Sequence, residues 1–315
     1  MMKAVIPTAD ARPMSIELRH LRYFLAVADT LHFGQAAERL GMSQPPLSQQ
    51  IRQLEELIGA RLFVRSHRRV QLTAAGELLQ ERARSIVQQV ESAVDEVQRA
   101  QRGEQGELRI GLTRATPLSP QIPRSILQYR QQYPQVRLQL SEMNTLQQID
   151  ALLDGSLDVG IIRKRTLPAE LVAHSLFVDP LALIVHADHP ALRRLSKGGT
   201  LALRDLAQEP FVAFRRSAGA GIHDHMIALC AAAGFTPRIV QEAGEASTLI
   251  SLAAAGLGAA ILPSSCDHIR VEGARFVPLA DAGAHSEVQL AWRREGVTPL
   301  IRNFAGLLRE AFAEA

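Results

Sequence analysis

Cysteine and long apolar runs are both scarce in this chain. It has two cysteines, Cys230 and Cys266, among 315 residues. Two are too few for a disulfide framework, so we expect buried thiols in a reducing compartment. No stretch of 18 or more apolar residues lacks charges, which predicts no membrane span. The first residues lack the apolar stretch of a secretory signal, so we expect a cytoplasmic protein.

An excess of charge of one sign is also missing. The formal net charge is +3, with 47% hydrophobic and 21% charged residues. This balance excludes a disordered or collagen-like chain and fits about two globular domains, at roughly 150 residues each. Any nucleic-acid surface must therefore be local. The segment 61–69 has four arginines and a histidine without an acid, although alone it would equally fit a solvated loop.

Helical spacing organises the first hundred residues. Residues 1–15 lack periodicity and are expected to be a disordered extension. From Leu18 onward, apolar residues recur at spacings of three and four. The pattern predicts a first helix from Leu18 to about residue 31, a second over 34–40 and a third over 44–58. These helices and the arginine-rich segment predict a winged helix-turn-helix domain over 16–73.

The second and third predicted helices meet the requirements of a helix-turn-helix. Ala37 is small where the helices cross, Gly41 tolerates positive φ in the turn, and Leu47 is a buried aliphatic. Ser43 is placed to cap the third helix, and Pro45 lies in its first turn. An ordinary three-helix scaffold is the alternative. The expected DNA contacts, in the major groove and through wing arginines on phosphates, are Ser43, Gln44, Pro45, Pro46, Ser48, Gln49, Arg52, Arg65, Arg68 and Arg69.

An a/d heptad pattern runs through residues 74–102, after Thr73 as an N-cap. It predicts a coiled-coil linker helix that forms a homodimer, whereas the alternative is an amphipathic helix packed on its own domain. Dimer symmetry in turn predicts an inverted-repeat operator. The pattern ends at 102–106, a polar hinge with two glycines. The predicted dimerisation residues are Leu79, Ala83, Ile86, Val90, Ala93 and Val97.

Strands and helices alternate from residue 107 to the end. Alternation with short links predicts parallel α/β structure with right-handed crossovers. The pattern begins again near residue 181, so we expect two similar α/β lobes and a last helix over 298–313. The predicted strands are 108–112, 136–140, 157–162, 181–185, 211–214, 238–241 and 258–262, and the predicted helices 120–133, 145–153, 222–233 and 246–255. The fold class is therefore α/β with an all-α N-terminal module.

Several motifs resemble the LysR-type transcriptional regulators over nearly the whole chain. They are LRHLRYF at 18–24, AA at 36–37, SQPPLS at 43–48, LE at 54–55, LFVR at 62–65 and LTAAG at 72–76. EMNT at 142–145 and AAGLG at 254–258 resemble the branch that senses benzoate, muconate and chlorocatechol. The resemblance implies a winged helix-turn-helix and a dimerising linker helix. It also implies a two-lobed effector domain shaped like a periplasmic binding protein, with lobe one at 107–177 plus 280–315 and lobe two at 178–279. Homotetramers that bend promoter DNA, a small inducer and contact with RNA polymerase are further implications.

An inducer would bind in the crevice outside the carboxyl ends of the strands. Thr145 opens a Thr-x-x-Gln capping box and resembles the ligand-contacting threonine of that branch, although a plain N-cap is the alternative. Ala115 and Ile222 replace a serine and an aromatic residue of the branch, which disfavours a muconate-like ligand. Three arginines instead favour a small carboxylate, with an aromatic-derived inducer as the alternative, and the glycine-bearing loop 214–222 could form an anion nest. The expected inducer contacts are Thr113, Arg114, Ala115, Thr116, Thr145, Arg163, Phe214, Arg215, Gly221 and Ile222.

Motifs for catalysis are weak. His223 and His225 point about 200° apart on a helix and cannot share a metal ion. The glycine pairs at 219–221 and 256–258 lack the third glycine of a dinucleotide fingerprint, and no phosphate loop or nucleophile elbow occurs. We therefore expect no enzyme activity, metal or cofactor. The remaining alternatives are a solute-binding protein and a constitutive DNA-architectural protein without an inducer.

Overall fold

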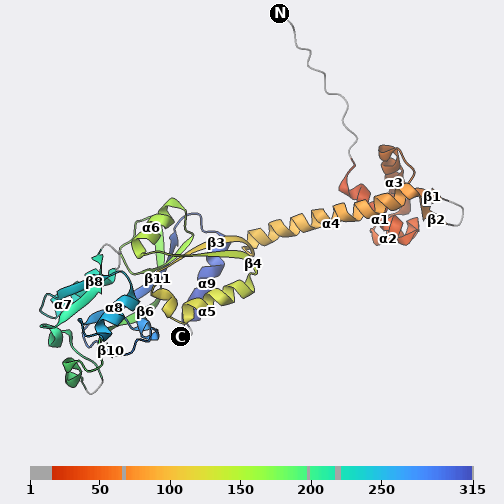
Figure 1. Cartoon of the computed structure of the whole chain (residues 1–315). Helices are drawn as coiled ribbons and strands as arrows, with labels where there is room; N and C mark the ends of the chain where they lie inside the picture. Colours follow the sequence, from red (N-terminus) through yellow and green to blue (C-terminus); the bar gives the residue numbers. More distant parts are fainter. Residues whose placement is uncertain (1–15, 66–68, 197–198, 217–220, 314–315) are drawn as a thin grey trace, which may run out of the picture. The chain divides into compact units, whose positions relative to one another are not determined.

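The computed structural model describes residues 16–65, 69–196, 199–216 and 221–313. These residues form two compact units, and the chain passes from the first to the second between Gln98 and Arg99 (Figure 1). The expected extension 1–15 lies outside the described residues. No helix of the described residues is long and apolar enough to cross a membrane.

The N-terminal unit begins with three short helices, α1 (Leu18–Thr30), α2 (Phe33–Arg39) and α3 (Gln44–Ile58). A two-stranded antiparallel wing follows, β1 (Phe63–Arg65) and β2 (Val70–Leu72). The winged helix-turn-helix that the sequence predicted is confirmed. Its core consists of buried side chains from all these helices and from β1, including Phe24, Val27, Leu47, Ile51 and Phe63.

The turn between α2 and α3 has the predicted geometry. Gly41 has φ +66°, which an L side chain rarely adopts. Ala37 is 2% exposed in the module core, so a larger side chain there would push the helices apart. Ser43 is the N-cap residue of α3, but its hydroxyl makes no capping hydrogen bond.

The long helix α4 (Ala74–Arg102) begins against the wing. The Thr73 hydroxyl accepts a hydrogen bond from the Gly76 amide at 2.9 Å and so caps the helix. A Cβ on Gly76 would lie 2.2 Å from the carbonyl oxygen of Leu62, so only glycine fits at this position. Ala83 is fully buried in the module core. The first turns of α4 therefore pack on their own module.

The first lobe of the C-terminal unit is a sheet covered by helices on both faces. Strands β3 (Gln105–Leu112), β4 (Gln135–Glu142) and β5 (Val159–Arg163) are parallel, and β11 (His285–Arg293) pairs antiparallel with β5. Helices α5 (Gln121–Gln132) and α9 (Pro299–Ala313) share one core cluster with the sheet, and α6 (Thr145–Asp154) shares another. Because β3 begins at Gln105, the predicted hinge is shorter than expected.

Strand β6 (Leu171–His186) runs through both lobes. Residues 171–180 pair with β11, and residues 181–186 pair with β9 (Ala260–Pro263) and β10 (Ala274–Pro278). Only its second half was predicted from the sequence, because Asp179-Pro180 breaks the apolar alternation and Pro180 has no amide hydrogen to donate. Strands β10 and β11 were also not predicted.

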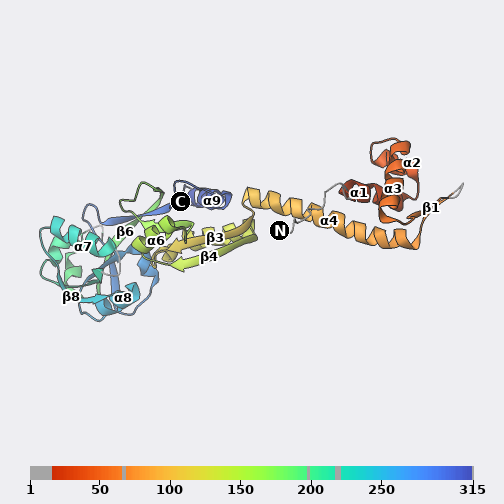
Figure 2. The same ribbon diagram turned by 90° about the horizontal axis from the view of Figure 1, so that it is seen from above.

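The second lobe adds a parallel pair of strands and two helices. Strand β7 (Pro210–Phe214) pairs with β8 (Arg238–Ala243), and helices α7 (Gly221–Ala232) and α8 (Ala246–Ala254) complete the lobe. Short 3-10 helices include η1 (Thr116–Leu118), between β3 and α5, and η5 (Ser264–His268), between β9 and β10. Figure 2 shows α7, α8 and β8 at one end of this unit and β3, β4 and α9 at the other.

Candidate effector site and DNA-contacting surface

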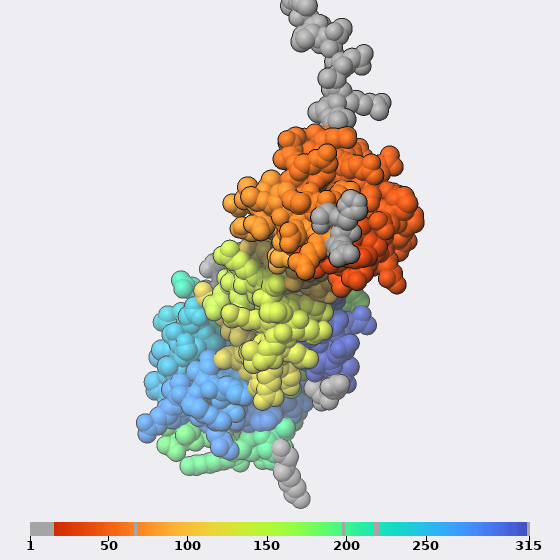
Figure 3. All heavy atoms as spheres, turned by 90° about the vertical axis from the view of Figure 1, so that its right-hand side faces the viewer, coloured from red at the N-terminus to blue at the C-terminus, as the bar shows by residue number. Residues whose placement is uncertain are grey.

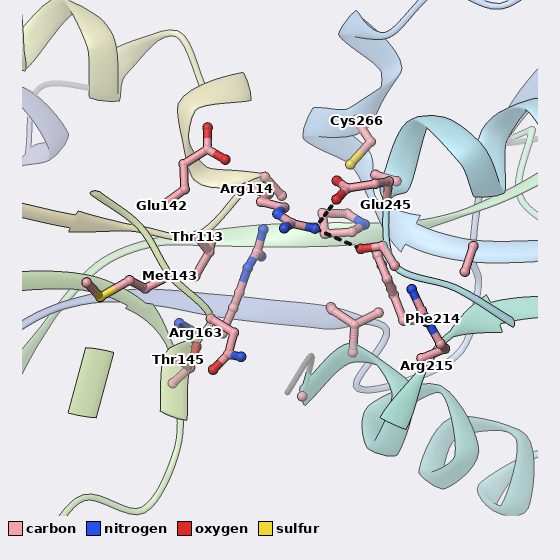
Figure 4. Close-up of a pocket in the computed structure, with 18 of the residues that line it drawn as sticks. Thr113, Arg114, Glu142, Met143, Thr145, Arg163, Phe214, Arg215, Glu245 and Cys266 are labelled. Atoms are coloured by element: carbon pink, nitrogen blue, oxygen red, sulfur yellow. Dashed lines mark hydrogen bonds and ion pairs between the residues drawn. The ribbon is translucent and has the colours of Figure 1, made fainter. Parts of the chain in front are cut away.

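A cavity of about 730 Å³ lies between the two lobes of the C-terminal unit (Figure 4). The first lobe lines it with the residues after β3, the segment between β4 and α6, and Arg163 at the end of β5. The second lobe adds the ends of β7 and β8 and the first residues of α7 and α8. These are carboxyl ends of strands, where the sequence predicted the site. The volume suits a small organic ligand.

Most of the expected inducer contacts meet in this cavity. Thr116 does not line it, because its side chain is buried and its hydroxyl donates to the Thr113 carbonyl at 2.9 Å. The residues that do line it are Thr113, Arg114, Ala115, Thr145, Arg163, Phe214, Arg215, Gly221 and Ile222. Residues 217–220 of the expected anion nest lie outside the described part of the chain.

The capping box at α6 is one residue earlier than predicted. Asn144 is the N-cap, and it exchanges hydrogen bonds with Gln147 at 2.9 and 3.0 Å. Thr145 is instead the first helical residue, and its hydroxyl accepts from the Arg163 amide at 3.3 Å. The buried Gln148 side chain donates to the carbonyls of Met143 and Ile161. Thr145 therefore lies at the wall of the cavity without capping the helix.

A buried ion pair forms the floor where the lobes join. Arg163 donates to Asp179 of β6 at 3.0 Å, with their side chains 10% and 4% exposed. Asp179 also accepts from the hydroxyls of Ser264 and Ser265 in η5, at 3.3 and 2.9 Å. The second terminal nitrogen of Arg163, Nη1, is buried without a hydrogen-bond partner. Arg163 thus lines the cavity with one terminal nitrogen that has no partner among the described residues.

The other two arginines of the cavity are more exposed. Arg114 pairs with Glu245 and donates to the Gly244 carbonyl at 3.2 Å. The Arg215 guanidinium lies beside Gly244, where a Cβ would be 3.0 Å from its Nη2. Among the described residues, no hydrogen bond or ion pair joins Arg215 to another side chain. Its charge is therefore free to attract an anion.

The remaining reactive side chains near the cavity have structural roles. His223 bonds through Nδ1 to the Phe214 carbonyl at 2.7 Å, and His225 through Nε2 to the Gly283 carbonyl at 3.1 Å. The two imidazoles therefore face different partners. Burial raises the pKa of the Cys266 thiol to about 12 and that of Cys230 to about 11. Both thiols stay protonated near neutral pH and are poor nucleophiles.

Several cavity residues were missed by the sequence analysis. They include polar groups that a ligand could meet, and they come from several loops, strand ends and helix starts that only the tertiary fold brings together. Their sequence signals were a position next to a predicted strand end or helix start and, for Glu142, Met143 and Asn144, the EMNT motif at 142–145. They are Glu142, Met143, Asn144, Gln147, Ala243, Gly244, Glu245, Ala246, Thr248, Pro263 and Cys266.

Helix α3 has an apolar face and an exposed polar face. It belongs to the winged-helix module, which is coloured red to orange in Figure 3. Leu47, Ile51 and Leu54 are fully buried. The opposite face exposes the residues expected to read bases: Ser43, Gln44, Pro45, Pro46, Gln49 and Arg52, with Ser48 half-buried. This division leaves short polar groups and one arginine available to DNA.

Two of the three arginines expected in the wing, Arg65 and Arg69, are among the described residues. Arg65 ends β1, with its guanidinium 4.5 Å from the Phe33 ring centroid, and Arg69 precedes β2. Both are exposed. Arg68 lies outside the described residues.

A buried glutamate near the end of α3 holds the start of the wing, a role that its place in the LE motif at 54–55 did not reveal. One oxygen of Glu55 accepts from the amides of Leu62 and Phe63 at 2.8 and 3.2 Å. Its other oxygen lies 3.3 Å from Arg61 and 3.9 Å from Arg65. The signal in the sequence was an acid adjacent to the apolar face of α3. Glu55 thus fixes both the backbone and the arginines of the wing.

Comparison with known proteins agrees with this architecture. The family described as "Bacterial regulatory helix-turn-helix protein, lysR family" matches residues 18–77, and "LysR substrate binding domain" matches 101–313. The chain is 45% identical to the HTH-type transcriptional regulator YnfL of Escherichia coli (strain K12) over 92% of this chain and 97% of the relative. It is 35% identical to the HTH-type transcriptional regulator CatR of Pseudomonas putida, over 94% and 99%.

A solved structure of a relative on DNA has the same fold. Full-length CbnR complexed with its target DNA has a TM-score of 0.79 at 29% identity, covering 94% of this chain and 99% of that one. These relatives are transcriptional regulators. This chain belongs to the LysR family of bacterial DNA-binding transcriptional regulators with an effector-binding domain.

Proposed function

We propose that this regulator binds promoter DNA as a homo-oligomer and responds to a small carboxylate held between the lobes of its effector domain. The observation that carries the proposal is the cavity lined by Arg114, Arg163 and Arg215. Arg163 keeps an unpartnered donor and Arg215 an uncompensated charge, so a carboxylate can be bound by both charge and hydrogen bonds. A neutral ligand would leave the charge of Arg215 uncompensated.

The DNA contacts are proposed for the exposed face of α3 and for the wing. Gln44, Ser48, Gln49 and Arg52 would meet base edges, while Arg65, Arg68 and Arg69 would meet phosphates. The CbnR complex supports DNA binding by this fold. The resemblance to regulators also supports RNA polymerase as a partner and the cytoplasm as the location.

The exposed part of α4 supports dimerisation. Ile86, Val90 and Val97 are 43%, 38% and 70% exposed, although the same heptad pattern continues through them from the buried Ala83. Apolar side chains at heptad positions are stabilised when a second helix covers them. We therefore propose a homodimer through α4, with the half-sites of an inverted repeat as its target, and a tetramer as the larger assembly.

The test is a footprint of the full-length chain on DNA that it selects from a random pool. We expect an inverted repeat, and we expect the protected region or its affinity to change when acetate, butyrate or benzoate is added. The neutral amides of these acids are the controls. A footprint that no carboxylate alters would support the constitutive DNA-architectural alternative, and failure to enrich any site would argue against sequence-specific binding.

A further inference from the structure

The Arg114–Glu245 ion pair crosses the effector cavity. Arg114 follows β3 in the first lobe, while Glu245 precedes α8 in the second lobe. Both side chains line the cavity, and Figure 4 shows them meeting across it. Arg114 also donates to the Gly244 carbonyl at 3.2 Å. One guanidinium from the first lobe is thus held by two groups of the second.

We propose that this pair is a latch, which a monocarboxylate ligand opens by replacing the Glu245 carboxylate on Arg114. The inference rests on the proposed function and adds to it the step by which the ligand acts. The exchange substitutes one carboxylate for another, so Arg114 remains paired throughout. The contact that joins the lobes is lost, and contacts through the ligand take its place.

The start of α8 supports this inference independently. Glu245 is the N-cap residue of α8, yet its side chain makes no capping hydrogen bond. Free amide groups and the helix dipole make a helix N-terminus favourable for a carboxylate. In the latched state the carboxylate is turned to Arg114 instead. Once displaced, Glu245 can turn back to the amides of its own helix, which lowers the cost of opening the latch.

The exposure of the pair makes it exchangeable. The Arg114 and Glu245 side chains are 60% and 49% exposed, and exposed ion pairs are individually weak. The Arg163–Asp179 pair differs, because it is buried and tied to Ser264 and Ser265. A ligand can therefore displace Glu245 but not Asp179. Arg163 keeps its place in the floor while Arg114 changes partner.

The latch also determines which ligands can act. A neutral amide cannot replace a carboxylate on a guanidinium without losing the charge interaction. If a ligand carboxylate binds while Glu245 stays on Arg114, two like charges lie side by side. Glu245 thus competes with anions at this subsite, and its removal should favour carboxylates over their amides.

Isothermal titration of the full-length chain with benzoate, butyrate and acetate, and with their amides, tests the latch. Glu245→Gln should bind the carboxylates roughly two- to fivefold more tightly than wild type, the range expected for an exposed ion pair. Amide binding should not change. Glu142→Gln is the matched control, because Glu142 also lines the cavity but has no ion pair with a described residue. It reports the general effect of removing a negative charge.

The latch predicts that Glu245→Gln raises carboxylate affinity more than Glu142→Gln does. In an Arg114→Gln background, adding Glu245→Gln should not raise carboxylate affinity further. Equal gains in the two glutamine variants, or a gain that persists without Arg114, would overturn it. Carboxylate binding to wild type with no difference among variants would overturn the latch and leave the proposed function standing. No carboxylate binding to any of these chains would overturn both.

Discussion

Replacing Asp179 with alanine should destabilise the effector domain by roughly 3–5 kcal/mol. The substitution leaves the Arg163 guanidinium, only 10% exposed, without its counter-ion. Nη1 of Arg163 already lacks a hydrogen-bond partner, so the side chain would keep few of its interactions. Ser264 and Ser265 would lose their common acceptor as well. A buried charge without a partner is among the costliest single defects in a folded domain.

Urea unfolding followed by Trp292 fluorescence measures this effect. Trp292 is the single tryptophan of the chain, it is 9% exposed in β11, and its ring stacks on His174 with centroids 5.0 Å apart. Its signal therefore reports the effector domain. Asp267→Ala is the control, because Asp267 pairs with Arg270 in an exposed position of the same 3-10 turn. The control should lose no more than about 1 kcal/mol. A similarly small loss for Asp179→Ala would mean that Arg163 reaches solvent.

Glu55→Ala should destabilise the winged-helix module by roughly 2–5 kcal/mol and sharply reduce DNA affinity. It removes the acceptor of the Leu62 and Phe63 amides, and each buried unsatisfied donor costs about 1–3 kcal/mol. Arg61 and Arg65 also lose the carboxylate beside them. The expected result is faster amide exchange over residues 59–72 and a lower melting temperature of the module. Glu56→Ala is the control, because Glu56 is the exposed neighbour on the same helix.

Glu55→Gln separates the two roles of the carboxylate. Its amide oxygen can still accept from Leu62 and Phe63, whereas its amide nitrogen would face Arg61 and Arg65. We expect near-normal amide exchange in the wing but weaker binding to the selected operator, measured by fluorescence anisotropy. Wild-type DNA affinity in Glu55→Gln would show that the arginines need no such support.

The parts of the structure governed by local rules were predictable from the sequence. The bounds of α3 agree with prediction because Leu47, Ile51 and Leu54 recur at helical spacing and Gly41 marks the turn before them. Helix α4 was placed equally well. Its heptad pattern could not show, however, that Ala83 is buried within its own module, because the same apolar spacing serves packing within a protomer and between protomers.

The features that the sequence did not predict depend on tertiary contacts. Asn144-x-x-Gln147 and Thr145-x-x-Gln148 are equally good capping boxes in sequence; the first one forms because Gln148 is buried and bonded to carbonyls of two other segments. Glu245 meets Arg114 across 131 positions of the chain, which no local pattern reveals. Cavity positions next to strand ends were therefore predictable, but the partners of their charges were not.

The most direct test of the account is thermal unfolding of the full-length chain, followed by Trp292, with each carboxylate and its neutral amide. A carboxylate bound between the lobes at 100 times its dissociation constant should stabilise the effector domain by about 2.7 kcal/mol and raise its melting temperature. The matching amide should have little effect. Equal shifts for acid and amide, or no shift with any carboxylate, would contradict an effector site built around Arg114, Arg163 and Arg215.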